Sequence, residues 1–286
     1  MTRTAPRTDT RRCLGIALAL GAALVAGVGC GNSRSQPQGQ VRVSVAKGSR
    51  ADDRLMRPAF EAALGNVNRE IRLPSPLTVR VVDDREAERR GISGPTYEPR
   101  EHVVYFPWSF VDESRRQLPD DAELRDAMVF ALYHELTHGL IALLDVPVVG
   151  GEERAADSLA AVFAIRSQSG GQQIPLGMAK LLKTRSESQR LRSGPYAADD
   201  YADDHELDPQ RAADALCLVY GSNPRRYAGL VGKDLPQARA DRCPFEYGQE
   251  LHAWRRLLAA WLTKRGGLLP DRGASASNTV QHVAAS

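Results

Sequence analysis

Cysteine is scarce in this chain, where only four of 286 residues are cysteines. Cys13 lies within an apolar N-terminal run and Cys30 ends it, so only Cys217 and Cys243 remain for the rest of the chain. Neither has a second cysteine or a histidine beside it at metal-ligand spacing, which argues against a cysteine-based zinc centre. In an oxidising compartment, an even pair predicts a disulfide between Cys217 and Cys243. Two buried free thiols are the alternative.

An excess of charge of one sign is also lacking once the N-terminus is set aside. The formal net charge of +3 comes from 38 basic and 35 acidic residues, and the first 30 residues hold four arginines and one aspartate. The remainder therefore has 34 residues of each sign and is neutral. The basicity belongs to the N-terminal segment, and the sequence predicts no nucleic-acid partner.

The N-terminus has the layout of an export signal. Arginines precede an uncharged apolar run, residues 13–29, which ends in small residues. Residues 26–30 resemble a bacterial lipobox, although Gly27 stands where leucine is usual. We therefore expect residues 1–29 to be a lipoprotein signal peptide, Cys30 to carry lipid, and the protein to be anchored in the cell envelope outside the cytoplasm. An uncleaved membrane anchor is the alternative, because the run is close to the length that spans a bilayer.

The rest of the chain predicts a single α+β domain, residues 41–270, after a flexible tether at 30–40 and before a disordered tail at 271–286. Alternating or apolar runs predict strands at 41–45, 77–82 and 102–106, with a helix at 54–64 and a loop at 91–99. From residue 120 onward the pattern is mostly helical, with helices expected at 120–144, 152–163, 175–182, 207–220 and 243–262. The sequence shows no internal repeat.

The segment at 131–140, ALYHELTHGL, carries an H-E-x-x-H pattern inside a helix with apolar residues at three- and four-residue spacing. His134 and His138 are one turn apart and project from the same face. Two imidazoles placed in this way can hold one zinc ion, with Glu135 beside them to accept a proton from a metal-bound water. A buried helix with two satisfied core histidines is the alternative.

A catalytic zinc site needs a third protein ligand, and the longer histidine pattern is absent because Ile141 and Leu144 occupy its places. The next helix instead offers Glu153 and Asp157, four residues apart on one face. We expect Glu153 to bind the metal.

Asp157, one turn beyond Glu153, is expected to accept the other ring N–H of His134. Glu152 competes with Glu153 for the role of third ligand. A solvated acidic face paired with Arg154 is the alternative to a metal-binding face.

Three further residues are candidates to stabilise the oxyanion that forms at a scissile carbonyl. His205, at the start of a helix, is the first, and Tyr196 and Tyr201 in the acidic segment before it could do the same. A surface histidine in an acidic loop is the alternative for His205. We interpret His102 as a surface residue and His252 as structural.

The strand at 102–106 precedes the motif helix and could be an edge strand that lines the cleft. A substrate backbone could then add to the sheet beside it. An ordinary sheet strand is the alternative.

Several segments together resemble a bacterial metallopeptidase family. These are residues 134–140 (HELTHGL), 151–157 (GEERAAD), 204–208 (DHELD), 217–222 (CLVYGS) and 242–247 (RCPFEY), and the resemblance extends from about residue 41 to 262.

The H-E-x-x-H and E-x-x-x-D patterns also resemble the thermolysin-like, or gluzincin, group. That resemblance implies a zincin-like fold, the metal ligands His134, His138 and Glu153, the base Glu135, and Asp157 behind His134. It gives no certain counterpart of the oxyanion histidine, so the role of His205 stays open.

The sequence therefore predicts a metallopeptidase that binds one zinc ion per chain and hydrolyses a peptide or protein substrate. The alternatives are a non-catalytic, lipid-anchored protein with a structural zinc site, and a zinc hydrolase of cell-wall peptides. The sequence does not predict the substrate or the oligomeric state.

Overall fold

The computed structural model describes residues 39–45, 52–264 and 268. The expected signal peptide, the lipidated Cys30, most of the tether and the C-terminal tail lie outside these residues. The expectations for them therefore remain predictions.

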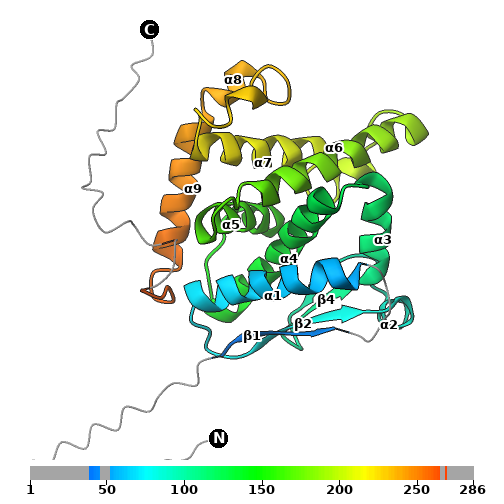
Figure 1. The fold of residues 1–286 in the computed structure, drawn as a ribbon, viewed down its shortest axis with the longest axis vertical. Coiled ribbons are helices and arrows are strands. Elements are labelled where there is room, and N and C mark those ends of the chain that lie inside the picture. Colours follow the sequence, from blue (N-terminus) through cyan, green and yellow to red (C-terminus); the bar gives the residue numbers. More distant parts are fainter. Residues whose placement is uncertain (1–38, 46–51, 265–267, 269–286) are drawn as a thin grey trace, which may run out of the picture. The chain divides into compact units, whose positions relative to one another are not determined.

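The N-terminal half forms a four-stranded mixed sheet in the order β1-β2-β4-β3 (Figure 1). Strands β1 (Val41–Val45), β2 (Leu77–Val82) and β4 (Val103–Pro107) run parallel, and the short β3 (Thr96–Glu98) pairs antiparallel with β4. Helix α1 (Asp53–Glu70) supplies the crossover that a parallel β1–β2 pair requires.

The two faces of the sheet are covered by different helices. On one face, Phe106 of β4 packs against Phe60 of α1, with ring centroids 4.9 Å apart. On the other, Val103 and Tyr105 cluster with Ala87 of α2 (Asp84–Arg90). Strand β4 is thus buried on both sides, as a continuous apolar run in a parallel sheet indicates.

Of the two alternatives for the strand at 102–106, the structure contradicts the edge strand and agrees with an ordinary sheet strand. This strand, β4, is an interior strand between β2 and β3. The two edge strands are β1 and β3, and β3, which contacts α4, lies within the segment 91–99 that was expected to be a loop. Three residues, Thr96, Tyr97 and Glu98, are too few to give a readable alternating pattern, so only the pairing with β4 reveals the strand.

Helix α4 (Asp121–Leu144) is central to the fold and contacts α1, α3 (Trp108–Gln117), α5, α6, β3 and β4. The Asp120 carboxylate caps it by accepting hydrogen bonds from the backbone N–H groups of Ala122 and Glu123. The helix is long and apolar enough to cross a membrane, but 78% of its most apolar window is buried in the protein. We therefore assign its hydrophobicity to the core.

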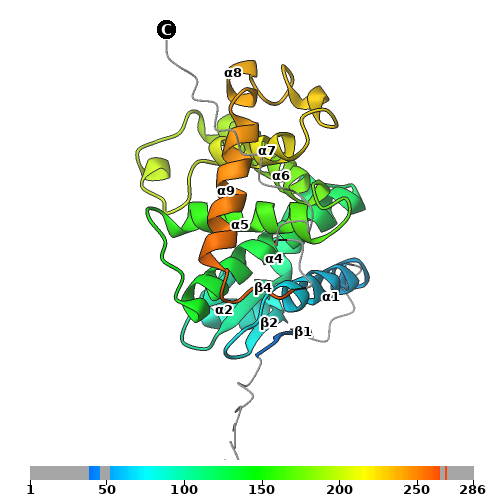
Figure 2. The same cartoon turned by 90° about the vertical axis from the view of Figure 1, so that its left-hand side faces the viewer.

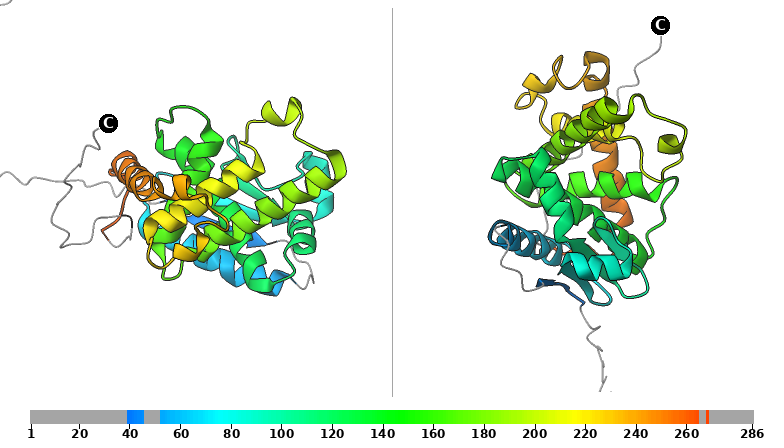
Figure 3. Two further views of the ribbon diagram at one scale, coloured as in Figure 1. Left: turned by 90° about the horizontal axis from the view of Figure 1, so that it is seen from above. Right: turned by 90° about the vertical axis from the view of Figure 1, so that its right-hand side faces the viewer.

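The C-terminal half is helical, as expected. It comprises α5 (Glu152–Ser167), α6 (Gln173–Ser193), α7 (Asp208–Ser222), α8 (Gln237–Ala240), α9 (Cys243–Leu257) and two short 3-10 turns, Asp199–Tyr201 and Ala228–Leu230. Helix α6 packs along α4, and Figure 2 shows α9 crossing α5 and α7, both of which it contacts. In Figure 3, α7 lies beside α6 and leads toward α9.

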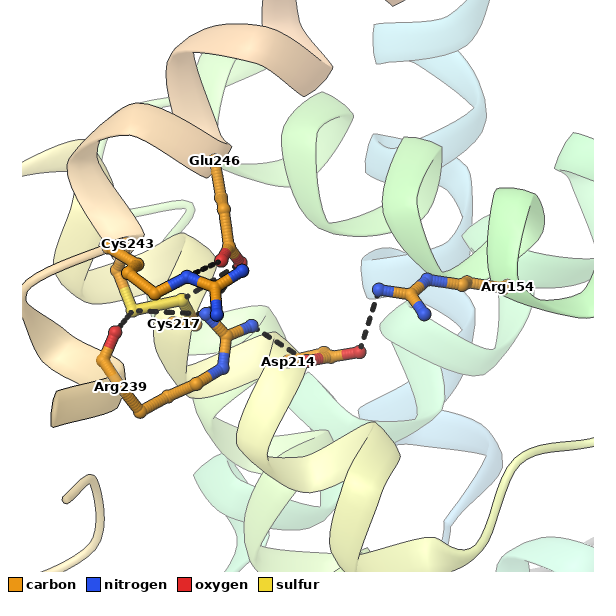
Figure 4. The surroundings of a disulfide bond; sticks show 7 residues. Arg154, Asp214, Cys217, Arg239, Cys243 and Glu246 are labelled. Carbon is orange, nitrogen blue, oxygen red and sulfur yellow. Dashed lines mark hydrogen bonds and ion pairs between the residues drawn. A yellow bond between two sulfur atoms is a disulfide. The ribbon is translucent and has the colours of Figure 1, made fainter. Parts of the chain in front are cut away.

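The predicted disulfide is present and joins α7 to α9 through Cys217 and Cys243. Figure 4 shows the ion pairs around it: Arg239 lies between Glu246 and Asp214, and Arg154 of α5 approaches Asp214 from the other side. Four helices, α5, α7, α8 and α9, are thus linked at this place, and the disulfide agrees with a location outside the cytoplasm.

Candidate metal centre

Helix α4 places its two motif histidines on the face that meets α5. His134 and Glu135 are buried, with 4% and 9% of their surfaces exposed. The His134 ring and the Glu135 carboxylate border a cleft. The ring centroids of His134 and His138 are 4.9 Å apart. The helical spacing read from the sequence therefore brings both rings to one site.

Gly139 allows this turn of α4 to approach the sheet closely. A Cβ atom at this position would lie 2.8 Å from a methyl group of Leu77 and 3.3 Å from the ring of Tyr97. A larger side chain would push the helix away from β2 and β3. The glycine thus helps to bring His138 next to the edge strand.

Helix α5 contributes the acidic group that completes the cluster. The Glu153 Oε2 atom lies 2.9 Å from His134 Nε2 and 3.4 Å from His138 Nε2. The two Nε2 atoms are 3.3 Å apart. Two donors that each lie about 2.1 Å from a tetrahedral zinc ion are themselves about 3.4 Å apart. The donor set and its spacing therefore fit a small divalent cation.

Each motif histidine is held through its other ring nitrogen by a carboxylate from α5. His134 Nδ1 lies 2.8 Å from Asp157 Oδ1, and His138 Nδ1 lies 2.8 Å from Glu152 Oε1. Both Nε2 atoms are thereby turned toward Glu153. This is the arrangement that fixes the tautomer and direction of metal-binding imidazoles.

Asp157 is itself held by a buried arginine from α7. Arg211 Nε donates to Asp157 Oδ2 at 2.7 Å, and a terminal nitrogen of Arg211 donates to Oδ1 at 3.0 Å. The two-pronged pair fixes the carboxylate plane, and through it the ring of His134. The support of the site thus extends over three helices: α4, α5 and α7.

The cluster is strongly coupled electrostatically. Burial would lower the pKa of His134, but its bonds to Asp157 and Glu153 raise it to about 9. Burial would raise the pKa of Glu153, yet its contacts with His134, His138 and His205 hold it well below the usual range. In the same way, bonds from His134 and Arg211 outweigh burial and depress the pKa of Asp157. Both carboxylates are thus fully ionised near neutral pH.

Glu135 behaves differently, although it lies beside these groups. Its burial raises the pKa of the carboxyl, while His134, His138 and the backbone N–H of Tyr97 favour its charged form. The net result is a carboxylate that is more basic than usual. The Glu135 carboxylate also borders two hollows, one on each side of the cluster.

His205 reaches the same site from the segment just before α7. Its Nε2 lies 2.8 Å from Glu153 Oε2, and its ring stacks on His134 with centroids 5.7 Å apart. One donor atom from each of His134, Glu153 and His205 lies within 4.8 Å of the others. Three histidines, His134, His138 and His205, therefore converge on the Glu153 carboxylate.

The other candidate residues lie in different surroundings. The hydroxyl of Tyr196 donates to Ser186 of α6 at 2.9 Å, and Tyr201 is exposed. His102 Nδ1 lies 3.0 Å from the Tyr97 hydroxyl, and His252 is exposed on α9. Within the described residues, neither tyrosine hydroxyl contacts the histidine–glutamate cluster.

Two hollows flank the cluster. A cavity of about 210 Å³, the Arg185 pocket, lies between α3, α4 and α6 and reaches His134, Glu135 and His205. A second hollow of about 330 Å³, the edge-strand hollow, runs beside Thr96 and Tyr97 of β3 and reaches Glu135, His138, Glu153 and His205. The cluster therefore lies where a substrate could contact both hollows at once.

Sequence reasoning missed two supporting residues, Arg211 and the carboxylate that orients His138. Arg211 precedes Ala215 and Leu218 by four and seven residues, so it lies on the same apolar face of the helix. A cation on an apolar face needs an anionic partner, and this position therefore indicates one. Glu152 was considered only as a competing ligand. The contact of Glu152 with His138 depends on the angle between α4 and α5, which no local sequence pattern shows.

Comparison with known proteins agrees with this geometry. Residues 45–258 match a family model described as "Putative metallopeptidase", and neither the curated proteins nor the solved structures gave a significant match. The matched region includes the histidine–glutamate cluster, its supporting residues and the two cysteines of the disulfide, Cys217 and Cys243. The chain therefore belongs to this metallopeptidase family.

Proposed function

We propose that the protein is a zinc-dependent peptidase in which His134, His138 and Glu153 bind one zinc ion. The observation that carries this proposal is the convergence of two Nε2 atoms and one carboxylate oxygen at separations of 2.9–3.4 Å, beside a buried glutamate. Imidazole and carboxylate donors at this spacing are typical of zinc sites in hydrolases.

A bound zinc ion would polarise the scissile carbonyl and lower the pKa of a coordinated water to roughly 7. The protein residues would do the remaining work. Glu135 accepts a proton from the attacking water and passes it to the nitrogen of the leaving amine. Its buried position and raised pKa suit both roles, because it must hold the proton between the two steps.

His205 is the candidate donor to the oxyanion that forms at the scissile carbonyl. Its Nε2 already points at the cluster, while its Nδ1 lies 3.3 Å from Asp203. If Asp203 keeps the Nδ1 proton in place, the imidazolium form can donate from Nε2. The assignment leaves three protein ligands and an open coordination position, as catalytic zinc sites have.

The substrate in this proposal is a peptide that docks along β3. This strand is the free edge of the sheet on the cleft side, and its residues Thr96 and Tyr97 border the edge-strand hollow. A peptide can pair with such an edge through its backbone. The expected envelope location makes secreted peptides and cell-wall peptides suitable test substrates.

The test uses the purified full chain and three variants. Glu135→Gln is expected to keep one zinc per chain and to lose at least about 10³-fold in turnover, because the proton acceptor is removed. His138→Ala is expected to lose zinc. His252→Ala, an exposed histidine on α9, is the matched control and should retain both zinc and turnover.

Metal content is measured by elemental analysis, and cleavage by mass spectrometry of a peptide mixture that includes cell-wall fragments. Equal zinc content in the wild type and His138→Ala would refute the ligand assignment. An unchanged turnover in Glu135→Gln would refute the mechanism.

A further inference from the structure

The Arg185 pocket has apolar walls and two arginines in its lining, of which Arg211 donates to Asp157. Phe110, Phe130, Met178 and Leu182 form the walls, and Arg185 from α6 borders the same space. The cavity also reaches His134 and Glu135. Its volume of about 210 Å³ suits one side chain of a substrate better than a whole small-molecule ligand.

No carboxylate of the described residues binds the Arg185 guanidinium. Among the described residues, no hydrogen bond or ion pair of its guanidinium is found, and its nearest aromatic contact is Phe110, with the guanidinium carbon 5.0 Å from the ring centroid. Asp208 and Glu113 attract it over a longer distance, and Arg211 repels it. Burial outweighs these attractions and lowers the pKa of Arg185, although an arginine stays charged in any protein.

Arg185 is partly buried. A partly buried guanidinium with unused donors is costly, because donors that have lost water gain no partner in exchange. A carboxylate can satisfy it through two parallel hydrogen bonds, while the Phe110 ring supports its flat face. The apolar walls would at the same time accept the methylene groups that carry such a carboxylate. The residues of the pocket are thus complementary to a short apolar stem with an acidic end.

The edge-strand hollow has the opposite charge. Its lining includes Glu135, Glu152 and Glu153 and no lysine or arginine. An acidic substrate group would be repelled there and attracted toward Arg185. The two hollows therefore distinguish the two sides of a bound peptide by charge.

We propose that the Arg185 pocket is the specificity pocket of this peptidase and takes a substrate group that ends in a carboxylate. The group is either an aspartate or glutamate side chain or the free C-terminus of a peptide. This inference rests on the proposed function, because it requires a peptide across the metal centre. Arg185 is assigned as the residue that recognises the acid.

The test measures binding, so it does not depend on turnover. Zinc-loaded Glu135→Gln protein is incubated with two random hexapeptide libraries, one with free and one with amidated C-termini, and retained peptides are identified by mass spectrometry. We expect acidic peptides to be enriched about 10-fold over their glutamine counterparts. Enrichment of acidic side chains in the amidated library assigns the preference to a side chain. About 10-fold greater retention of the free library than of the amidated one, without a side-chain preference, assigns it to the chain end.

Second-site variants identify the residue responsible. Arg185→Gln should abolish the acid preference, and Arg185→Lys should retain it in weakened form, because a lysine keeps the charge without the two-pronged geometry. Arg190→Gln changes an exposed arginine on the same helix and should leave the preference intact. Circular dichroism confirms that each variant is folded.

The inference is overturned if neither an acidic side chain nor a free C-terminus increases retention, if no peptide is retained, or if Arg185→Gln preserves the preference. These results leave the proposed function to be judged separately by zinc content and by cleavage in the wild type. Zinc-dependent cleavage without an acid preference would reject the pocket assignment alone. Loss of zinc binding and cleavage would reject the proposed function itself.

Discussion

The two histidines that contact Glu153 Oε2 most closely come from parts of the molecule that are built differently. His134 lies on α4, with 6% of its side chain exposed, and Asp157 and Arg211 hold it from behind. His205 lies before α7, with 42% of its side chain exposed. Its own partner, Asp203, has a side chain that is 62% exposed.

This difference in burial indicates that the two histidines have different roles. Metal ligands need fixed positions, and groups on packed helices with buried supports provide them. An oxyanion donor acts on a charge that develops only during the reaction, so it must contact the substrate and therefore border the open cleft. The buried side of the site is thus suited to hold the metal, and the exposed side to act on the substrate.

The largest effect should follow from breaking the buried support. Asp157→Asn leaves the guanidinium of Arg211 without its ionic partner, which should cost roughly 3–5 kcal/mol of stability. The freed ring of His134 should also weaken zinc binding by about 10- to 100-fold. Urea unfolding and competition with a zinc chelator measure these effects. Asp203→Asn is the matched control, and comparable losses in both variants would contradict the different roles described above.

The disulfide is expected to have the next largest effect. Cys217 and Cys243 are 26 residues apart, so replacing both by serine should lower the free energy of unfolding by about 3.5 kcal/mol in the loop-closure model. The effect should be confined to stability, because the bond joins α7 to α9 and neither cysteine borders the cleft hollows. A double variant that unfolds at the wild-type urea concentration would show that the ion pairs around Arg239 suffice.

His205→Asn tests the exposed side. As an oxyanion donor, His205 should contribute a factor on the order of 10²–10³ to kcat, about 3 kcal/mol, with zinc affinity nearly unchanged. As a fourth metal ligand, it would instead contribute chiefly to zinc affinity and close the coordination position that a reacting water needs. Parallel measurements of kcat and of the zinc dissociation constant therefore distinguish the two roles.

The smallest expected effect concerns Glu250 of α9, which accepts a hydrogen bond from Ser158 at 2.6 Å. Burial raises the pKa of Glu250 above its usual value. Because the folded state binds this proton more tightly than the unfolded chain does, stability falls as pH rises from the unfolded pKa through the folded one. Above that window the folded protein carries the whole cost of a buried charge.

Glu250→Gln should therefore raise the melting temperature at pH 8 by about 2 °C, a shift that corresponds to less than about 1 kcal/mol in a domain of this size. The difference from the wild type should disappear near pH 3, below the pKa of about 4.3 of an unfolded glutamate, where the carboxyl is protonated in both states. A constant difference across the pH range would mean that packing, and not charge, is responsible. Calorimetric scans at several pH values measure it.

Local periodicity was sufficient to predict much of the geometry of the candidate site, whereas the roles of its residues remain predictions. The helical repeat places His134 and His138 on one face, and the same repeat places Glu153 and Asp157 on one face of the next helix. The pairing of Cys217 with Cys243 followed from their number. These predictions succeeded because each depends on one helix or on a count.

The parts that were missed depend on packing between distant segments. Strand β3 exists because β4 offers it backbone partners, and the polar helix α2 has no apolar stripe of its own beyond Ala87. The partner of Arg211 lies 54 residues away in the chain. Whether β4 lies at the edge or inside the sheet stayed open at the level of the sequence, because the sequence gives strand order no direct signal.

The shortness of β3 has a consequence for how much of a substrate the cleft can hold. A strand of three residues extends for about 10 Å, and alternate backbone groups of an edge strand point toward its existing partner. A docked chain would thus find only one or two main-chain hydrogen bonds. With so few main-chain hydrogen bonds, substrate selection would depend mainly on side chains, and short oligopeptides could bind. The same few bonds would contribute little to unfolding a folded polypeptide before cleavage.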